Sequence, residues 1–269
     1  MSSSVATRTI ALVTGSNRGI GRAVALSLAR DHSYTVILAC RDFAAAQSTA
    51  EELTAELAAS PSAGTAKGEF VPIHLDFSSD SSISSLKSFL ETEYKGQLNV
   101  LVNNAGVLLD NFFHKPASEF ETLSPRELYT KTFESNTIGP AILTEELLPL
   151  LEKSSKPDQG RPSRIVFVSS IMGSLTISGD TTTAWYNNEA TAYDASKAAV
   201  NMLAVNFARR LKPVGGLSNA VCPGLRATRL TSGYGGSVED GAKKIVEMAT
   251  LVKGAVSGKF VNEEGDIPW

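Results

Sequence analysis

The sequence has few of the residues that build metal sites and disulfide frameworks. Its 269 residues include two cysteines, Cys40 and Cys222, and three histidines, at positions 32, 74 and 114. Two cysteines so far apart suggest neither a disulfide framework nor a zinc site, and the histidines lack the spacing of metal ligands. We therefore expect no metal and no disulfide.

An excess of one charge and long apolar runs are also absent. The net charge is −3, with basic and acidic residues interspersed, so there is no basic stripe for nucleic acid and no cationic helix for a membrane surface. No run approaches the roughly 18 apolar residues of a membrane span. The polar start Met1-Ser2-Ser3-Ser4 lacks the apolar core of a signal peptide. We expect a cytoplasmic protein with a small-molecule ligand.

Strand-like and helix-like segments alternate along the chain. Apolar runs typical of buried parallel strands cover 9–14, 34–39, 70–75, 98–103 and 164–169, and helical patterns cover 20–30, 43–58, 79–94 and 191–212. No Pro/Ser-rich linker divides the chain. This predicts one α/β domain over 1–269, a doubly wound Rossmann-type fold whose parallel sheet of about seven strands, in the order 3-2-1-4-5-6-7, has helices on both faces. Cys40 and Cys222 would then lie about 19 Å apart.

A glycine-rich loop follows the first predicted strand. Its pattern, Gly-x-x-x-Gly-x-Gly, departs from the usual Gly-x-Gly-x-x-Gly and is weak evidence alone, but a strand precedes it and a helix follows. Such a loop lets the backbone approach a pyrophosphate at the helix N-terminus. The cofactor contacts expected from the loop are Gly15, Asn17, Arg18, Gly19, Ile20 and Gly21.

The end of the second strand indicates which dinucleotide binds. An acidic residue there binds the ribose 2′-hydroxyl of NAD, whereas arginine accommodates the 2′-phosphate of NADP. Here the uncharged Cys40 is followed by Arg41, which together with Arg18 favours NADP(H). Asp42 counts against this assignment, and the alternative is that both arginines are surface residues without a ligand.

Tyr193 and Lys197 lie four residues apart in a predicted helix. At this spacing both side chains project from one face, and a nearby cation favours the phenolate form of tyrosine. None of the other five tyrosines has a lysine four positions later. The alternative is a tyrosine and a lysine that fall by chance on a solvated helix face.

These motifs occur together in the order of a known family. The chain resembles the short-chain dehydrogenase/reductase family over nearly its whole length, and within it the NADPH-dependent carbonyl reductases. The motifs are Thr14-Gly-x-x-x-Gly-x-Gly21, Asn103-Asn-Ala-Gly106, Asn136, Ser170, Tyr193-x-x-x-Lys197 and Pro223-Gly224-x-x-x-Thr228.

The resemblance implies catalytic roles for four residues. Tyr193 would donate a proton to a carbonyl, Ser170 would hydrogen-bond to it, Lys197 would bind the nicotinamide ribose and lower the pKa of the phenol, and Asn136 would complete a relay through water. Ser169 is the alternative serine, and Asn136 could simply face solvent. Further cofactor contacts are expected at Asp76, Phe77, Asn104, Ala105, Gly106, Pro223, Gly224 and Thr228.

Three segments are expected to surround a carbonyl or alcohol substrate: 107–123, 171–190 and 225–238. The second makes the spacing from Ser170 to Tyr193 unusually long, which in carbonyl reductases accompanies a monomeric state; a homo-oligomer is the alternative. Either Trp185 or Tyr186 should lie near the substrate. Glycines at 233, 235 and 236 suggest a lid in the third segment.

Two other functions fit parts of the sequence. A catalytically silent nucleotide-sensing or scaffold protein would keep the fold but lose the tyrosine or lysine. An epimerase or dehydratase would need a further substrate domain, for which only about 40 residues remain after Gly224.

A proline marks a predicted break in the helix that carries Asn136. Pro140 lies inside a helix predicted over 126–151, which begins with a capping box of Ser124 and Glu127. Because proline lacks an N–H, we predict a bend there and a water between the Asn136 carbonyl and Lys197.

Overall fold

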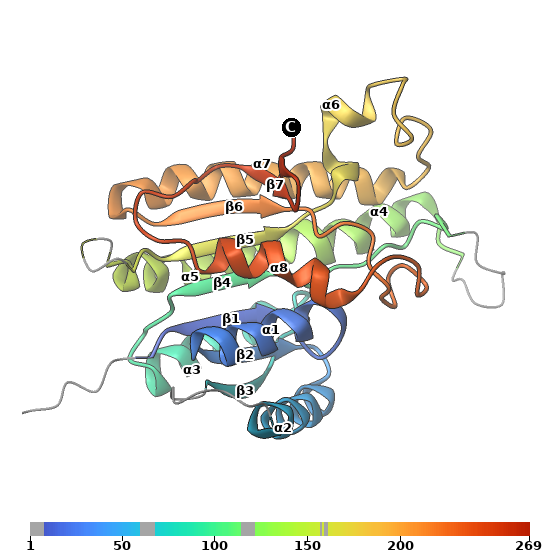
Figure 1. Cartoon of the computed structure of the whole chain (residues 1–269). Helices are drawn as coiled ribbons and strands as arrows, with labels where there is room; N and C mark the ends of the chain where they lie inside the picture. The colour runs from blue at the N-terminus through green and yellow to red at the C-terminus, as the bar shows by residue number, and fades with distance from the viewer. Residues whose placement is uncertain (1–7, 60–67, 114–121, 157, 159–160) are drawn as a thin grey trace, which may run out of the picture.

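The computed structural model describes residues 8–59, 68–113, 122–156, 158 and 161–269. Their strands form one eight-stranded sheet in the order β3-β2-β1-β4-β5-β6-β7-β8 (Figure 1). The strands are β1 (Ile10–Thr14), β2 (Thr35–Cys40), β3 (Glu69–His74), β4 (Val100–Asn103), β5 (Arg164–Val168), β6 (Leu217–Val221), β7 (Phe260–Asn262) and β8 (Gly265–Asp266). The fold is the single Rossmann-type α/β domain that the sequence predicts.

The predicted strand order is confirmed, and the sheet has one strand more than expected. Neighbours from β3 to β7 pair in parallel. Strand β8 instead pairs antiparallel with β7, after a tight turn in which the Asn262 side chain accepts the backbone N–H groups of Glu264 and Gly265. A strand of two residues has no detectable hydrophobic period, so sequence analysis could not find it.

Helices cover both faces of this sheet. Helices α1 (Gly19–His32), α2 (Phe43–Ala59) and α8 (Val238–Ala249) pack on one face, and α3 (Asp80–Glu93), α5 (Gly139–Ser154) and α7 (Thr191–Leu211) pack on the other. In β4, Leu101 faces the core under α3, α5 and α7, whereas Val100 and Val102 face the opposite core. Each strand therefore needs apolar residues on both sides, which explains the continuous apolar runs.

The helix predicted over 126–151 is interrupted close to the predicted break at Pro140, by a turn of a different kind from the expected bend. The capping box of Ser124 and Glu127 is present at the start of α4 (Pro125–Phe133). A π-helical turn, η1 (Glu134–Ile138), then precedes α5, and the N–H of Gly139 donates to the carbonyl of Glu134 five residues back. The irregularity therefore lies before Pro140 and consists of a wider turn, where a bend at the proline itself was expected.

In the described part of the chain, three further short helices lie in the connections: two follow the carboxyl end of β5, and one joins α7 to the start of β6. They are η3 (Ile171–Gly173), α6 (Leu175–Ser178) and η4 (Lys212–Val214). In Figure 1, α6 and the chain after it project beyond the end of α7. Residues 114–121 of the predicted substrate segment, and the polar start at Met1, lie outside the described residues.

Both cysteines are buried free thiols: Cys40 ends β2 and Cys222 directly follows β6, and β1, β4 and β5 lie between these two strands in the sheet. Among the described residues, no helix has the length and apolarity that a membrane span requires.

Gly139 offers a test of the packing around the π-helical turn. Alanine in place of a helical glycine usually stabilises a protein by about 0.5–1 kcal/mol. Here a Cβ at Gly139 would lie 2.3 Å from the Cβ of Phe77, so we expect Gly139→Ala to destabilise. The expected loss is about 1–3 kcal/mol in urea unfolding, as for other overpacked cores. Thr130→Ala, on an exposed part of α4, is the control. A variant as stable as the parent would contradict this packing.

Candidate active site

The candidate site lies at the carboxyl ends of β4 and β5, against the first turns of α7. Tyr193 and Lys197 share one face of α7, and the Lys197 Nζ lies 5.5 Å from the centre of the Tyr193 ring. Both are almost entirely buried, with 7% of Tyr193 and 5% of Lys197 exposed. The Nζ donates to the carbonyl of Val168, the last residue of β5, at 2.9 Å. A pair on a solvated helix face is therefore excluded.

The two adjacent serines after β5 have different environments. Ser169 is buried, and its hydroxyl donates to the Lys197 carbonyl on the backbone of α7 at 3.3 Å. Ser170 caps η3, where its oxygen accepts the N–H of Met172, and its hydroxyl also hydrogen-bonds to the Tyr193 phenol. Of the two, Ser170 is the one in contact with the phenol.

Asn136 lies in the π-helical turn and does not face solvent. It is 2% exposed, and its side chain bonds to both backbone groups of Val107, accepting the N–H at 2.8 Å and donating to the carbonyl at 2.9 Å. Its Nδ2 also donates to Ser196 Oγ at 3.0 Å. Asn136 thus joins the loop after β4 to α7, while the predicted water on its carbonyl stays a prediction.

Burial controls the ionisation of the candidate pair. It raises the pKa of the Tyr193 phenol well above its usual value; Cys222 and Asp194 add to this, and the bond to Ser170 opposes it. Burial also lowers the pKa of Lys197 to about 8. Because burial disfavours the phenolate, the pKa of the phenol is raised overall, whereas the position of Lys197 alone would lower it. At neutral pH Tyr193 is a neutral phenol with a proton to donate.

The glycine loop has the geometry that a dinucleotide needs. Gly15 and Gly19 have φ values of 63° and 57°, in the left-handed region that favours glycine. The N-cap of α1 is Arg18, whose side chain makes no capping bond, and the first turn contains no acidic residue. The Arg18 side chain therefore does not cap the first N–H groups of α1. A helix N-terminus of this kind is suited to bind a phosphate.

Asn104 connects this loop to the end of β4. Its Nδ2 donates to the carbonyls of Thr14 at 2.8 Å and Gly15 at 3.3 Å. The Thr14 hydroxyl in turn accepts the N–H groups of Asn104 and Ala105. Asn104 thus lies beside the glycine loop, and its side chain hydrogen-bonds to the backbone of that loop. Gly106 lies against the site, because a Cβ there would be 3.1 Å from Asn136 Oδ1 and 3.5 Å from Lys197 Nζ.

The predicted phosphate-binding arginines lie beyond the carboxyl ends of β1 and β2. Arg18 and Arg41 are exposed, the charge of Arg18 acts on the Cys40 thiol, and that of Arg41 acts on Asp76. Asp42 has another role, because its Oδ1 accepts the N–H of Ala45 at the start of α2. Asp42 therefore has a partner at the start of α2, and the choice between the two dinucleotides stays a prediction.

Among the other predicted cofactor residues, several have clear local partners. Asp76 accepts the N–H and hydroxyl of Ser78, which, as hydrogen bonds to the carboxylate, lower its pKa. Phe77 packs against Gly139, Ile20 packs against the core below α1, and the Asn17 carbonyl accepts the Thr49 hydroxyl. Ala105 touches the glycine loop, since a Cβ on Gly15 would lie 3.0 Å from its Cα.

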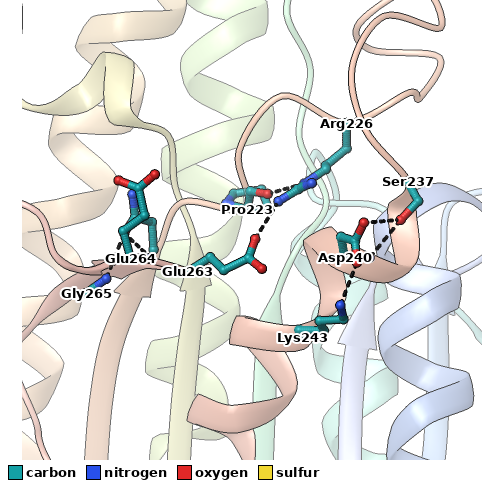
Figure 2. Close-up of polar contacts among 9 residues, drawn as sticks. Pro223, Arg226, Ser237, Asp240, Lys243, Glu263, Glu264 and Gly265 are labelled. Carbon is teal, nitrogen blue, oxygen red and sulfur yellow. Dashed lines mark hydrogen bonds and ion pairs between the residues drawn. The ribbon is translucent and has the colours of Figure 1, made fainter.

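The segment after β6 returns to the glycine loop. Thr228 lies beside Gly19, where a Cβ would be 3.5 Å from its methyl group. Arg226 connects the start of this segment to the turn after β7. Its Nε donates to the carbonyl of Pro223 at 2.6 Å, and its guanidinium pairs with Glu263 at 3.3 Å (Figure 2). A Cβ on Gly224, Gly236 or Gly241 would lie 2.8–3.2 Å from this side chain. Sequence analysis missed Arg226 because its partners come from three separate segments.

Apolar side chains surround Tyr193 on the side away from α7. Tyr193, Met172 and Ala190 form a small buried cluster, against which Ile171, Leu108, Phe112 and Trp185 pack. Of the two aromatic residues expected near the substrate, Trp185 joins this cluster, while Tyr186 is 48% exposed. Phe113 stacks on Tyr234 with ring centres 5.8 Å apart, which links the loop after β4 to the segment after β6.

Known proteins resemble the chain over most of its length. A family model described as short chain dehydrogenase matches residues 9–236. The short-chain dehydrogenase anuI of Penicillium roqueforti is 32% identical over 267 residues, or 97% of this chain and 96% of that protein. Carbonyl reductase 1 of Bos taurus, whose name specifies NADPH, is 31% identical over 292 residues, or 97% of this chain and 98% of that protein.

A solved structure agrees with this result. The NADPH-bound carbonyl reductase from chicken fatty liver matches 98% of this chain and 99% of its own, with a TM-score of 0.74 and 26% identity.

Asp194 provides a pH-dependent test of the environment beside Tyr193. Burial raises the pKa of its carboxyl to about 7; the bond from Asn188 opposes this, and the charge of Asp110 adds to it. A folded-state pKa above the unfolded value of about 3.9 means that stability is greatest when Asp194 is protonated. That stability is lost as pH rises from about 4 to 7.

We therefore expect Asp194→Asn to be more stable than the parent at pH 8 and equally stable near pH 4. The half-exposed carboxyl reduces the effect to about 1 kcal/mol, or about 2–4 °C in melting temperature. Thermal unfolding at several pH values measures it, and a difference that is independent of pH would argue against a raised pKa.

Proposed function

The chain belongs to the short-chain dehydrogenase family and is an oxidoreductase, and on that basis we propose that it is an NADPH-dependent carbonyl reductase. It would interconvert a ketone or aldehyde with the corresponding alcohol. The observation that carries this proposal is the buried phenol of Tyr193, with Ser170 and Lys197 beside it at the carboxyl end of β5. The names of the bovine and chicken relatives support it.

The residues proposed to bind the cofactor suit a dinucleotide with a 2′-phosphate. When bound, NADPH supplies the hydride. The uncapped first turn of α1 would bind the pyrophosphate, Arg18 and Arg41 the 2′-phosphate, and Asp76 and Phe77 the adenosine end. The remaining contacts would come from Gly15, Asn17, Gly19, Ile20, Gly21, Asn104, Ala105, Gly106, Tyr193, Lys197, Pro223, Gly224 and Thr228.

Tyr193 would act as the general acid for reduction and the general base for oxidation. Its hydroxyl would donate a proton to the substrate oxygen while Ser170 holds that oxygen by a hydrogen bond. Lys197 has three N–H donors and one described protein acceptor, Val168, so the others are available for the ribose hydroxyls. Asn136 would serve the proton relay by keeping the loop after β4 against α7.

The substrate would lie between the apolar cluster around Tyr193 and the segment after β6. Its walls would come from the predicted segments 107–123, 171–190 and 225–238, with Trp185 and Phe112 beside the reacting carbonyl. The proposal includes a cytoplasmic, monomeric enzyme, as the sequence leads us to expect.

Removal of the phenol hydroxyl tests the proposed acid. Tyr193→Phe should lower kcat by about a hundredfold to ten-thousandfold, the range for loss of a general acid or base. NADPH binding, followed by fluorescence, should persist. Tyr186→Phe, at an exposed tyrosine in a nearby segment, is the control and should keep full activity. The proposal fails if the control loses activity and Tyr193→Phe does not.

Cofactor selectivity tests the arginine at the end of β2. A hydrogen bond to a charged group contributes roughly 1.5–3 kcal/mol, so Arg41→Ala should weaken NADPH binding about tenfold to a hundredfold. NADH, which lacks the 2′-phosphate, should bind nearly as before. Arg30→Ala is the control, because Arg30 lies in the last turn of α1 and pairs with Asp31. Equal weakening of both cofactors would remove Arg41 from the 2′-phosphate site.

A further inference from the structure

Helix α7 begins without a cap from its own sequence. Its N-cap residue is Ala190, whose side chain cannot accept a hydrogen bond. The first N–H groups of a helix have no partner within the helix and carry the positive end of its dipole. In α7 these groups lie within the buried wall of the candidate site, so an acceptor has to come from elsewhere.

Asp110 is that acceptor, although it lies 82 positions earlier in the chain. Its Oδ1 accepts the N–H of Ala192 at 3.0 Å, and its Oδ2 accepts the N–H of Tyr193 at 3.1 Å. The side chain is 8% exposed, so the two bonds form out of contact with bulk water. Both carboxylate oxygens are used, one for each amide.

The carbonyl of Tyr193 is connected to the loop after β4 through a chain of hydrogen bonds. It accepts the Ser196 hydroxyl at 2.7 Å, and Ser196 Oγ accepts in turn from Asn136 Nδ2 at 3.0 Å. Asn136 bonds to both backbone groups of Val107. The loop that starts at Val107 is therefore connected to both peptide groups of Tyr193, directly through Asp110 and indirectly through Asn136 and Ser196.

We infer that Asp110 is a positioning residue for Tyr193, which fixes the phenol relative to the substrate wall after β4. The inference rests on the proposed function, because it assigns to Asp110 the placement of the proposed acid. Phe112, two residues further on, packs against the cluster that contains Tyr193. One carboxylate thereby sets the distance between the proton donor and the apolar surface that a substrate would contact. Asp110 does not itself touch the reacting atoms.

Asparagine at this position tests the inference with almost no change in shape. In Asp110→Asn the amide can accept one N–H, but its own NH₂ group faces the other, so one of the two bonds is lost. We expect kcat to fall by about tenfold to a hundredfold, as for a misplacement of a reacting group by about 1 Å. The KM of the substrate and the Kd of NADPH should stay within about twofold, since Asp110 contacts neither.

A matched cap elsewhere separates positioning from general stability. Ser124→Ala removes the cap of α4, which is exposed and lies outside the candidate site. It should lower the melting temperature without changing kcat. If Asp110→Asn keeps kcat within about twofold of the parent, or loses kcat only in proportion to the folded fraction, the inference is overturned.

Amide hydrogen exchange on the parent protein gives a test that needs neither a folded variant nor an active enzyme. The N–H groups of Ala192 and Tyr193 should exchange as slowly as those in the interior of α7, because Asp110 binds them. Rapid exchange, as at an open helix end, would overturn the inference. Full activity of Tyr193→Phe would instead remove the proposed function and leave the exchange result to decide the role of Asp110.

Discussion

The burial of the Lys197 ammonium is the constraint on which the rest of the site depends. A charged group removed from water needs partners, and within the described residues Lys197 Nζ has the Val168 carbonyl but no carboxylate. That is why burial lowers the pKa of Lys197. The groups around Nζ include the Val168 carbonyl, the Tyr193 ring and the Cys222 thiol. A polyhydroxylated ligand beside Nζ would complete its hydrogen bonds.

The π-helical turn positions the Asn136 side chain in this site. A regular α-helix would place Asn136 one residue out of register relative to α5, whereas the wider turn brings its amide to the backbone of Val107 and to Ser196. The Phe77 side chain packs directly on Gly139, the residue after the π-helical turn. The helix irregularity, the loop after β4 and the first turns of α7 are therefore parts of one hydrogen-bonded unit.

Features that depend on short stretches of sequence could be predicted, and those that depend on distant contacts could not. The strand order, the glycine loop, the capping box and the Tyr193–Lys197 pair all follow from local spacing, and the structure has each of them. Asp110 could not be identified in this way, because the backbone N–H groups that donate to it lie 82 and 83 positions away. The one available signal was negative: a predicted helix preceded by Ala190, without a serine, threonine, aspartate or asparagine to cap it.

The direction of the Tyr193 pKa shift shows the same limit. Sequence spacing places a cation near the phenol, and from that alone a lowered pKa follows. The structure adds the depth of burial, which acts in the opposite direction and is larger. A neutral phenol is suited to donate a proton to a carbonyl, whereas oxidation of an alcohol would need the phenolate. The protein's own groups therefore favour the neutral phenol, which is the form that can donate a proton.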